Sequence, residues 1–248
     1  MNTIWSLVVL FSSAFAQAQL GDSSALKVGV HASYSYMHYK EPGAMSERGF
    51  LTGIKLEIGG PLVDSVSVLA AGRYSVGYLN YNGAVLGTGT PVTTLTRDWV
   101  VDARIGFVFG PPDTNIFIGY AKRDWLNDMR VSYRRETWYE YIPVRAQYGG
   151  EGMFIAGEYR NWLGGKNVSW LTDVDVTKND VTMKQNKGSG YSIEWGYLFS
   201  GGAVQTRISL AYEHWDIEPS ELGFDGTQYV VEPKNSTDLT TVSIGVLF

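Results

Sequence analysis

Near the carboxyl end of the chain, one histidine lies between carboxylates, in Glu213-His214-Trp215-Asp216. A histidine that a carboxylate orients can act as a general base near neutral pH. In an extended strand, however, successive side chains point to opposite faces. His214 then points away from Glu213 and has no orienting partner on its own face. We expect no catalytic residue here and interpret His214 as a histidine at a membrane interface.

Other reactive groups are sparse. Cys is absent, which excludes disulfides and thiolate metal sites. Asp173-Val174-Asp175 could hold a cation if the segment is extended, but carboxylate pairs of this kind are mostly solvated. With only three histidines, a Ser–His arrangement of the kind a lipid hydrolase needs is not evident. The sequence therefore indicates no enzyme, no metal and no cofactor.

Charged residues recur at alternate positions opposite apolar rows. In the clearest case, Trp99, Val101, Ala103, Ile105, Phe107 and Phe109 alternate with residues that include Asp98, Asp102 and Arg104. A period of two predicts β-strands with one apolar and one polar face. We expect the polar faces to form a charge network from these residues: Arg73, Asp102, Arg104, Arg145, Glu158, Glu194 and Arg207. Its expected pairs are Arg73–Asp102, Arg145–Glu158 and Glu194–Arg207.

Ten segments share this alternation. They are 26–36, 50–58, 66–76, 98–109, 116–123, 142–148, 153–160, 191–199, 204–213 and 240–248. The connections alternate in length, with long loops at about 40–49, 79–97 and 163–188, and short turns such as Gly59-Gly60-Pro61 and Gly110–Asp113. An even number of strands of about 9–12 residues, with short turns at one end, is typical of bacterial outer-membrane barrels.

The ends of the chain agree with this interpretation. The apolar run Ile4–Ala14 leads into small-x-small cleavage sequences, which predicts a signal peptide at 1–18 and a barrel at 19–248. Phe248 ends an amphipathic strand, and we expect the barrel-assembly machinery to recognise this aromatic. The 8 Trp and 16 Tyr suit a protein with two membrane–water interfaces, and the net charge of −5 argues against a nucleic-acid partner.

Aromatic placement indicates which face meets lipid. The aromatics of the apolar face cluster toward the two ends of the strands, with aliphatic residues between them. They are Tyr34, Tyr36, Tyr78, Trp99, Tyr120, Tyr159 and Tyr212 toward the long loops, and Phe107, Phe109, Tyr148, Tyr197, Phe199 and Phe248 toward the short turns. A secreted soluble barrel with an apolar interior has no reason for this distribution. We expect the apolar face to contact lipid, with Lys122 and Glu140 paired on it near the outer interface.

Three segments resemble a known group. Tyr39–Ser46, Tyr141–Val144 and Glu232–Asn235 are similar to segments of small, uncharacterised proteobacterial outer-membrane β-barrel proteins of the porin-like kind. The resemblance covers most of the mature chain and implies a fold and a location, but no activity. Omptin-like proteases also have ten strands, but that family is known for an Asp pair that faces an Asp–His pair at the extracellular rim. Here the second long loop has no acidic residue before Asp98, and the fourth has no His.

The sequence thus predicts an all-β, ten-stranded, antiparallel up-and-down transmembrane barrel in the cell outer membrane. We expect a non-enzymatic monomer with a plugged lumen, whose extracellular loops have a structural or surface-interaction role. Its expected partners are membrane lipid, lipopolysaccharide and the assembly machinery. A narrow porin-like diffusion channel is the alternative, and an omptin-like hydrolase is the third.

Overall fold

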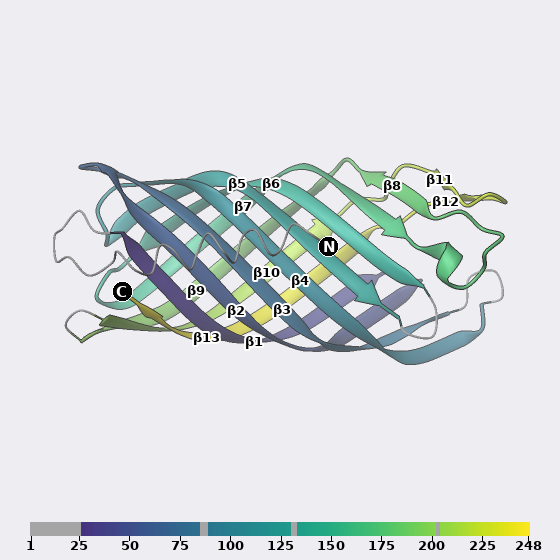
Figure 1. The fold of residues 1–248 in the computed structure, drawn as a ribbon, viewed down its shortest axis with the longest axis horizontal. Coiled ribbons are helices and arrows are strands. Elements are labelled where there is room, and N and C mark those ends of the chain that lie inside the picture. Colours follow the sequence, from purple (N-terminus) through teal and green to yellow (C-terminus); the bar gives the residue numbers. More distant parts are fainter. Residues whose placement is uncertain (1–25, 85–88, 130–132, 202–203) are drawn as a thin grey trace.

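The computed structural model describes residues 26–84, 89–129, 133–201 and 204–248, so the expected signal peptide lies outside the described residues. Within them, ten antiparallel strands close into one barrel (Figure 1). The barrel strands are β1 (Lys27–Glu41), β2 (Met45–Val63), β3 (Val66–Ala84), β4 (Pro91–Phe109), β5 (Thr114–Asp128), β6 (Arg134–Tyr148), β7 (Gly152–Ser169), β9 (Gly188–Gly201), β10 (Val204–Ile217) and β13 (Asn235–Leu247). The predicted fold class is confirmed. No helix in this part of the chain is long and apolar enough to cross a bilayer.

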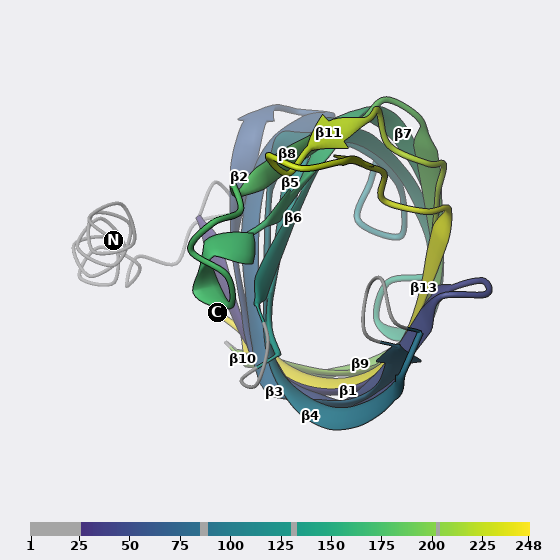
Figure 2. The same ribbon diagram turned by 90° about the vertical axis from the view of Figure 1, so that its right-hand side faces the viewer.

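The ring closes between the first and the last strand, as Figure 2 shows in a view along the barrel. β1 pairs with β13 from Gly29↔Leu247 to Lys40↔Ser236. Phe248 continues this ladder, because its N–H donates to the Val28 carbonyl at 2.9 Å and its carbonyl accepts from the Val28 N–H at 3.2 Å. No edge strand remains in a closed ring of this kind.

The strands are longer than the sequence pattern predicts. β2, β3 and β4 have 19 residues each, and the predicted loop at 40–49 is reduced to the turn between Glu41 and Met45. The predicted loop at 163–188 contains the end of β7, a 3-10 turn (Leu171–Asp173) and β8 (Val181–Gln185). These extensions carry Thr, Asn and Gly because water, and not lipid, surrounds them. In these extensions the outward positions are therefore no longer regularly apolar, and the period-two pattern is absent.

One short turn is also displaced. β2 continues through Gly59, Gly60 and Pro61 to Val63, where a register shift occurs opposite β3. The Gly59–Pro61 turn was therefore a wrong prediction. Gly110–Asp113 does connect β4 to β5 as expected, and Gly110 has a φ of 101°, which suits glycine.

The outward face carries the predicted aromatic distribution. Tyr34, Phe50 and Tyr78 toward one end of the barrel, and Phe107 and Phe199 toward the other, are each about half exposed, as side chains that face lipid must be. On β1 and β2 the lipid-facing band, meaning the outward apolar and aromatic side chains, ends at two exposed charged residues, Lys40 and Arg48.

Lys122 and Glu140 are cross-strand neighbours, as the register predicted. Within the part of the chain that the structure describes, however, the expected ion pair between these two side chains does not form. Lys122 Nζ lies 4.4 Å from the centroid of the Trp138 ring, and Glu140 accepts a hydrogen bond from Tyr120. Aromatic neighbours on the same face therefore take the place of the ion pair.

Candidate functional site

Glu213 on β10 is the hub of a charge network in the middle of the lumen. Arg73 of β3, Arg123 of β5 and Arg160 of β7 all bond to it, with Arg160 Nη2 2.7 Å from Oε2. None of these strands is a neighbour of β10 in the ring. Arg73 also donates from Nε and Nη2 to Asp102 Oδ2, at 3.0 and 2.6 Å, so the expected Arg73–Asp102 pair is present. The network therefore joins walls that the sheet does not join.

The other expected pairs are rearranged. Arg145 and Glu158 are register partners across β6 and β7, but Arg145 Nη2 donates to Glu194 on β9 at 2.7 Å. Glu158 instead accepts from Arg104 on β4, at 2.9 Å, and from Arg160 on its own strand. The Arg145–Glu158 pair was therefore a wrong prediction. Arginine side chains are long enough to reach carboxylates beyond the adjacent strand.

Glu194 and Arg207 do pair, at 2.9 Å between Oε1 and Nη2. The contact is diagonal, since Glu194 lies opposite Ala211 in the register. Closer to the short-turn end of the barrel, Lys55 Nζ lies 2.6 Å from Glu57 Oε2, and His31 Nε2 lies 3.1 Å from Glu57 Oε1. All seven residues of the predicted network are thus present in ion pairs in the lumen.

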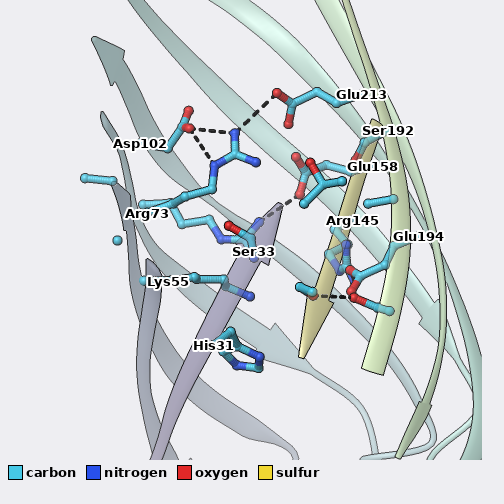
Figure 3. Close-up of a pocket in the computed structure, with 18 of the residues that line it drawn as sticks. His31, Ser33, Lys55, Arg73, Asp102, Arg145, Glu158, Ser192, Glu194 and Glu213 are labelled. Atoms are coloured by element: carbon cyan, nitrogen blue, oxygen red, sulfur yellow. Dashed lines mark hydrogen bonds and ion pairs between the residues drawn. The ribbon is translucent and has the colours of Figure 1, made fainter. Parts of the chain in front are cut away.

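These side chains surround a cavity of about 140 Å³ in the lumen. Figure 3 shows Arg73 reaching toward Asp102 and Glu213, with Lys55 and His31 at the opposite end of the cavity. Two polar atoms of the lining are buried without a hydrogen-bond partner, namely Arg160 Nη1 and Ser33 Oγ. The Arg160 guanidinium also lies over the Trp215 ring, with Cζ 4.7 Å from the ring centroid.

Buried apolar side chains form a layer in the half of the lumen toward the long loops, and the sequence reasoning missed it. Its first cluster contains inward-facing residues of β1 to β5 and β13: Met37, Tyr39, Leu51, Leu79, Val100, Trp125 and Leu239. Its second contains Ala121, Tyr139, Tyr141, Trp215 and Ile217. Met37, Leu79 and Trp215 have no exposed surface although they face the bore. The sequence did contain a signal for this layer. Near the long-loop ends of the strands, apolar residues occupy alternate positions whose side chains point into the lumen.

A second polar cluster lies beyond this layer, at the long-loop end of the barrel, which we expect to be extracellular. Arg135 of β6 is 3% exposed, and its Nη1 lies 2.7 Å from Glu41 Oε1 and 3.5 Å from Glu232 Oε1. Its Nη2 lies 3.6 Å from Glu47 Oε1. The Tyr39 hydroxyl donates to both Glu41 and Glu232, at 2.7 and 3.2 Å. Glu232 belongs to the segment between β12 and β13, so this cluster fastens an extracellular loop to the barrel mouth.

This extracellular cluster contains more carboxylates than bases, and it lies beyond the band that Lys40 and Arg48 delimit. Burial raises the pKa of Glu47 to about 8, with Asp98, Glu41 and Glu232 adding to the shift and Arg135 opposing it. Burial likewise raises the pKa of Glu232 to about 7, with Glu41 adding to it. The pKa values of both carboxyl groups are therefore shifted upward into the neutral range.

The extracellular strand β8 supports a short hairpin, β11 (Gly223–Phe224) and β12 (Tyr229–Val230), on one side of the rim (Figures 1 and 2). Gly223 is required here, because a Cβ at this position would be 2.3 Å from Val181 Cγ1. Phe224 and Tyr229 contact each other on the opposite, exposed face, with ring centroids 5.2 Å apart and the rings tilted by 52°.

His214 does have an orienting partner, contrary to expectation. Its Nδ1 lies 2.8 Å from Oδ1 of Asp238, which is opposite it on β13, and the Tyr212 hydroxyl donates to the same oxygen. Alternation along a single strand could not reveal a partner on the next one. The group faces outward, away from the lumen, and His214 packs against Tyr191 at 5.1 Å.

The candidate cation pair is taken up by protein contacts. Asp173 accepts three hydrogen bonds from Arg134, two from its guanidinium at 2.9 and 3.0 Å and one from its backbone N–H at 3.2 Å. Asp175 accepts from the backbone and hydroxyl of Thr177. Across the described ranges, no group of three or more His, Cys, Asp or Glu residues is arranged to hold a metal ion.

Neither a protein-family model nor a curated protein matches the sequence. Solved structures do match in fold. The outer membrane protease OmpT from Escherichia coli has a TM-score of 0.56 at 10% identity, over 94% of this chain and 99% of that one. The translocator domain of the autotransporter NalP from Neisseria meningitidis has a TM-score of 0.44 at 9% identity, over 98% and 95%. At these identities the likeness is one of fold, and by its fold the chain is an outer-membrane β-barrel protein located in the outer membrane.

Proposed function

We propose that the protein is a non-enzymatic, monomeric outer-membrane barrel with a closed lumen. Its extracellular loops have a structural or surface-interaction role. The observation that carries the closed lumen is the burial of inward side chains. Met37, Leu79 and Trp215 come from separate strands and have no exposed surface. In a water-filled bore these side chains would be wet, and an apolar constriction excludes water and ions.

The extracellular hairpin supports the interaction role. Tyr229 is 72% exposed, and Phe224 and Leu222 are also exposed beyond the lipid band. Clustered apolar residues on a water-facing surface are typical of interaction sites. Lipopolysaccharide and membrane lipid, which surround the outer half of such a barrel, are the expected partners of the outward face.

Planar-bilayer recording on the refolded protein tests the proposal. We expect no steady conductance, because the apolar layer spans the bore. Stable, well-resolved conductance steps from the unmodified protein would overturn the closed lumen and favour the narrow diffusion channel.

A hydrolase is the third possibility, because the similar structure OmpT is described as a protease. In this chain His31 is buried in the lumen far from the extracellular rim, whereas His38 and His214 face outward. No histidine is therefore available inside the rim to act as a base there. Peptide or lipid hydrolysis that is lost in His214→Ala would contradict the non-enzymatic role.

A further inference from the structure

The lumen cavity carries an excess of positive charge. Its lining contains six bases and four carboxylates: Lys55, Arg73, Arg104, Arg145, Arg160 and Arg207, against Asp102, Glu158, Glu194 and Glu213. Including the adjacent Arg123, which bonds to Glu213, and Glu57, which bonds to Lys55, adds one charge of each sign. The excess of two positive charges therefore stays the same whether or not these two adjacent residues are counted with the lining.

The carboxylates are already shared. Glu213 binds three guanidinium groups, whereas Glu158 and Glu194 bind two each. Arg160 still has a buried Nη1 without a hydrogen-bond partner, and Ser33 has a buried Oγ without one. An unpaired donor on a buried charged group is costly. A negatively charged ion in the cavity would offset the excess of positive charge around it.

We propose that this cavity binds a small oxyanion of the phosphate or carboxylate class, held by Arg160 and its neighbouring bases. A guanidinium group presents paired N–H donors that match the oxygens of such an anion. The volume of about 140 Å³ accommodates a small ion and excludes bulky ones. On β1 the cavity residues His31 and Ser33 lie on the short-turn side of the apolar residues Met37 and Tyr39, so the apolar layer separates the cavity from the long-loop end.

Inorganic phosphate is the probe that tests this site. Equilibrium dialysis of the refolded, full barrel at low ionic strength should show saturable phosphate binding. In Arg160→Gln the affinity should fall by about tenfold or more, since hydrogen bonds to charged groups contribute roughly 1.5–3 kcal/mol. Arg160→Gln leaves every carboxylate with a cation, because Glu213 keeps Arg73 and Arg123 and Glu158 keeps Arg104.

Arg134→Gln is the matched control. Arg134 bonds to Asp173 on the exposed extracellular extension, and its loss should leave phosphate affinity unchanged. Sulfate should compete with phosphate, whereas chloride at equal ionic strength should compete weakly. Absence of saturable binding in the unmodified protein, or equal loss in both variants, would overturn the site.

Ser33→Leu provides a second variant that alters no charge. The larger side chain fills the cavity from β1, so phosphate binding should be lost while the ion pairs remain. Unchanged binding in Ser33→Leu would show that phosphate binds elsewhere and would also overturn the proposal. The inference goes beyond the closed lumen and fails separately from it, because conductance tests the apolar layer and dialysis tests the cavity.

Discussion

Arg104 on β4 and Glu158 on β7 are bonded across the lumen, with 2.9 Å between Nη1 and Oε2. Two strands, β5 and β6, separate them along the wall of the barrel. The Glu158 side chain is only 2% exposed, so the contact lies in the interior and is shielded from solvent. Such a bond links strands that are not neighbours, a constraint that backbone pairing between adjacent strands does not supply.

Replacing Glu158 should therefore weaken the barrel. Glu158→Gln leaves Arg104 without its carboxylate and removes one of the two partners of Arg160. Breaking a buried ion pair typically costs roughly 3–5 kcal/mol, and we expect the low end because Arg104 is partly exposed. Urea unfolding of the refolded protein, followed by tryptophan fluorescence, measures this loss.

Asp173→Asn is the matched control for that measurement. It breaks the Arg134–Asp173 pair, whose side chains are 48% and 27% exposed. Exposed pairs contribute about 1 kcal/mol or less. If Asp173→Asn destabilised the barrel as much as Glu158→Gln, the lumen network would have no special structural role.

Conductance distinguishes the charge network from the apolar layer. If the ion pairs alone blocked the bore, changing Arg73, Arg145 and Arg207 to Ala would open it. Because the apolar layer lies at a different level, we expect this triple variant to remain closed in planar bilayers. Adding Trp125→Ala and Trp215→Ala, which removes two large buried rings from opposite walls, should give a measurable current. Conductance in the triple variant, without the Trp substitutions, would show that the charge network and not the apolar layer closes the bore.

The fold was predictable from sequence because lipid imposes a strict rule on the outward face. Every second residue of the membrane-spanning part must be apolar. This pattern predicted the number of strands, their order and the outward orientation of the Val242 and Ile244 side chains. The extensions of β3 and β7 were not predictable in this way, since water on both faces imposes no alternation.

The lumen was predictable only in part. Parity placed Arg73 and Asp102 together because they are direct register partners. It could not choose between Glu158 and Glu194 as the partner of Arg145, since the choice depends on side-chain reach across a curved wall. Asp238 was missed as the partner of His214 for a related reason, because register between distant segments is not visible in either segment alone.

Phe248 offers a test of barrel closure. It makes two backbone hydrogen bonds to Val28 at the seam, and its ring is 53% exposed on the outward face. Deleting Phe248 should reduce membrane insertion while secretion continues, because two hydrogen bonds at the end of the seam and the expected assembly signal are lost. Heat-modifiable protein in outer-membrane fractions reports the folded fraction. Phe199→Ala, which removes a similar outward ring from β9, should have a smaller effect. A normal folded fraction after the deletion would contradict the role of Phe248.

The last prediction concerns pH at the extracellular mouth. The pKa values of Glu47 and Glu232 are raised to about 8 and about 7, from ordinary values of 4.5. Between pH 4.5 and these values the folded protein binds more protons than the unfolded one, so the stability of the cluster falls as pH rises through that window.

Physically, ionising Glu47 and Glu232 adds two negative charges beside Glu41 and Asp98, with Arg135 alone to offset them. The segment that carries Glu232 should therefore be held more firmly at pH 5.5 than at pH 8.5. Hydrogen exchange of the backbone N–H groups in residues 228–235, corrected for the intrinsic pH dependence of exchange, measures this difference. Glu232→Gln keeps an uncharged side chain at every pH and should reduce the difference. Protection that rises with pH in the unmodified protein would show that Arg135 stabilises the ionised cluster, and the predicted sign would be wrong.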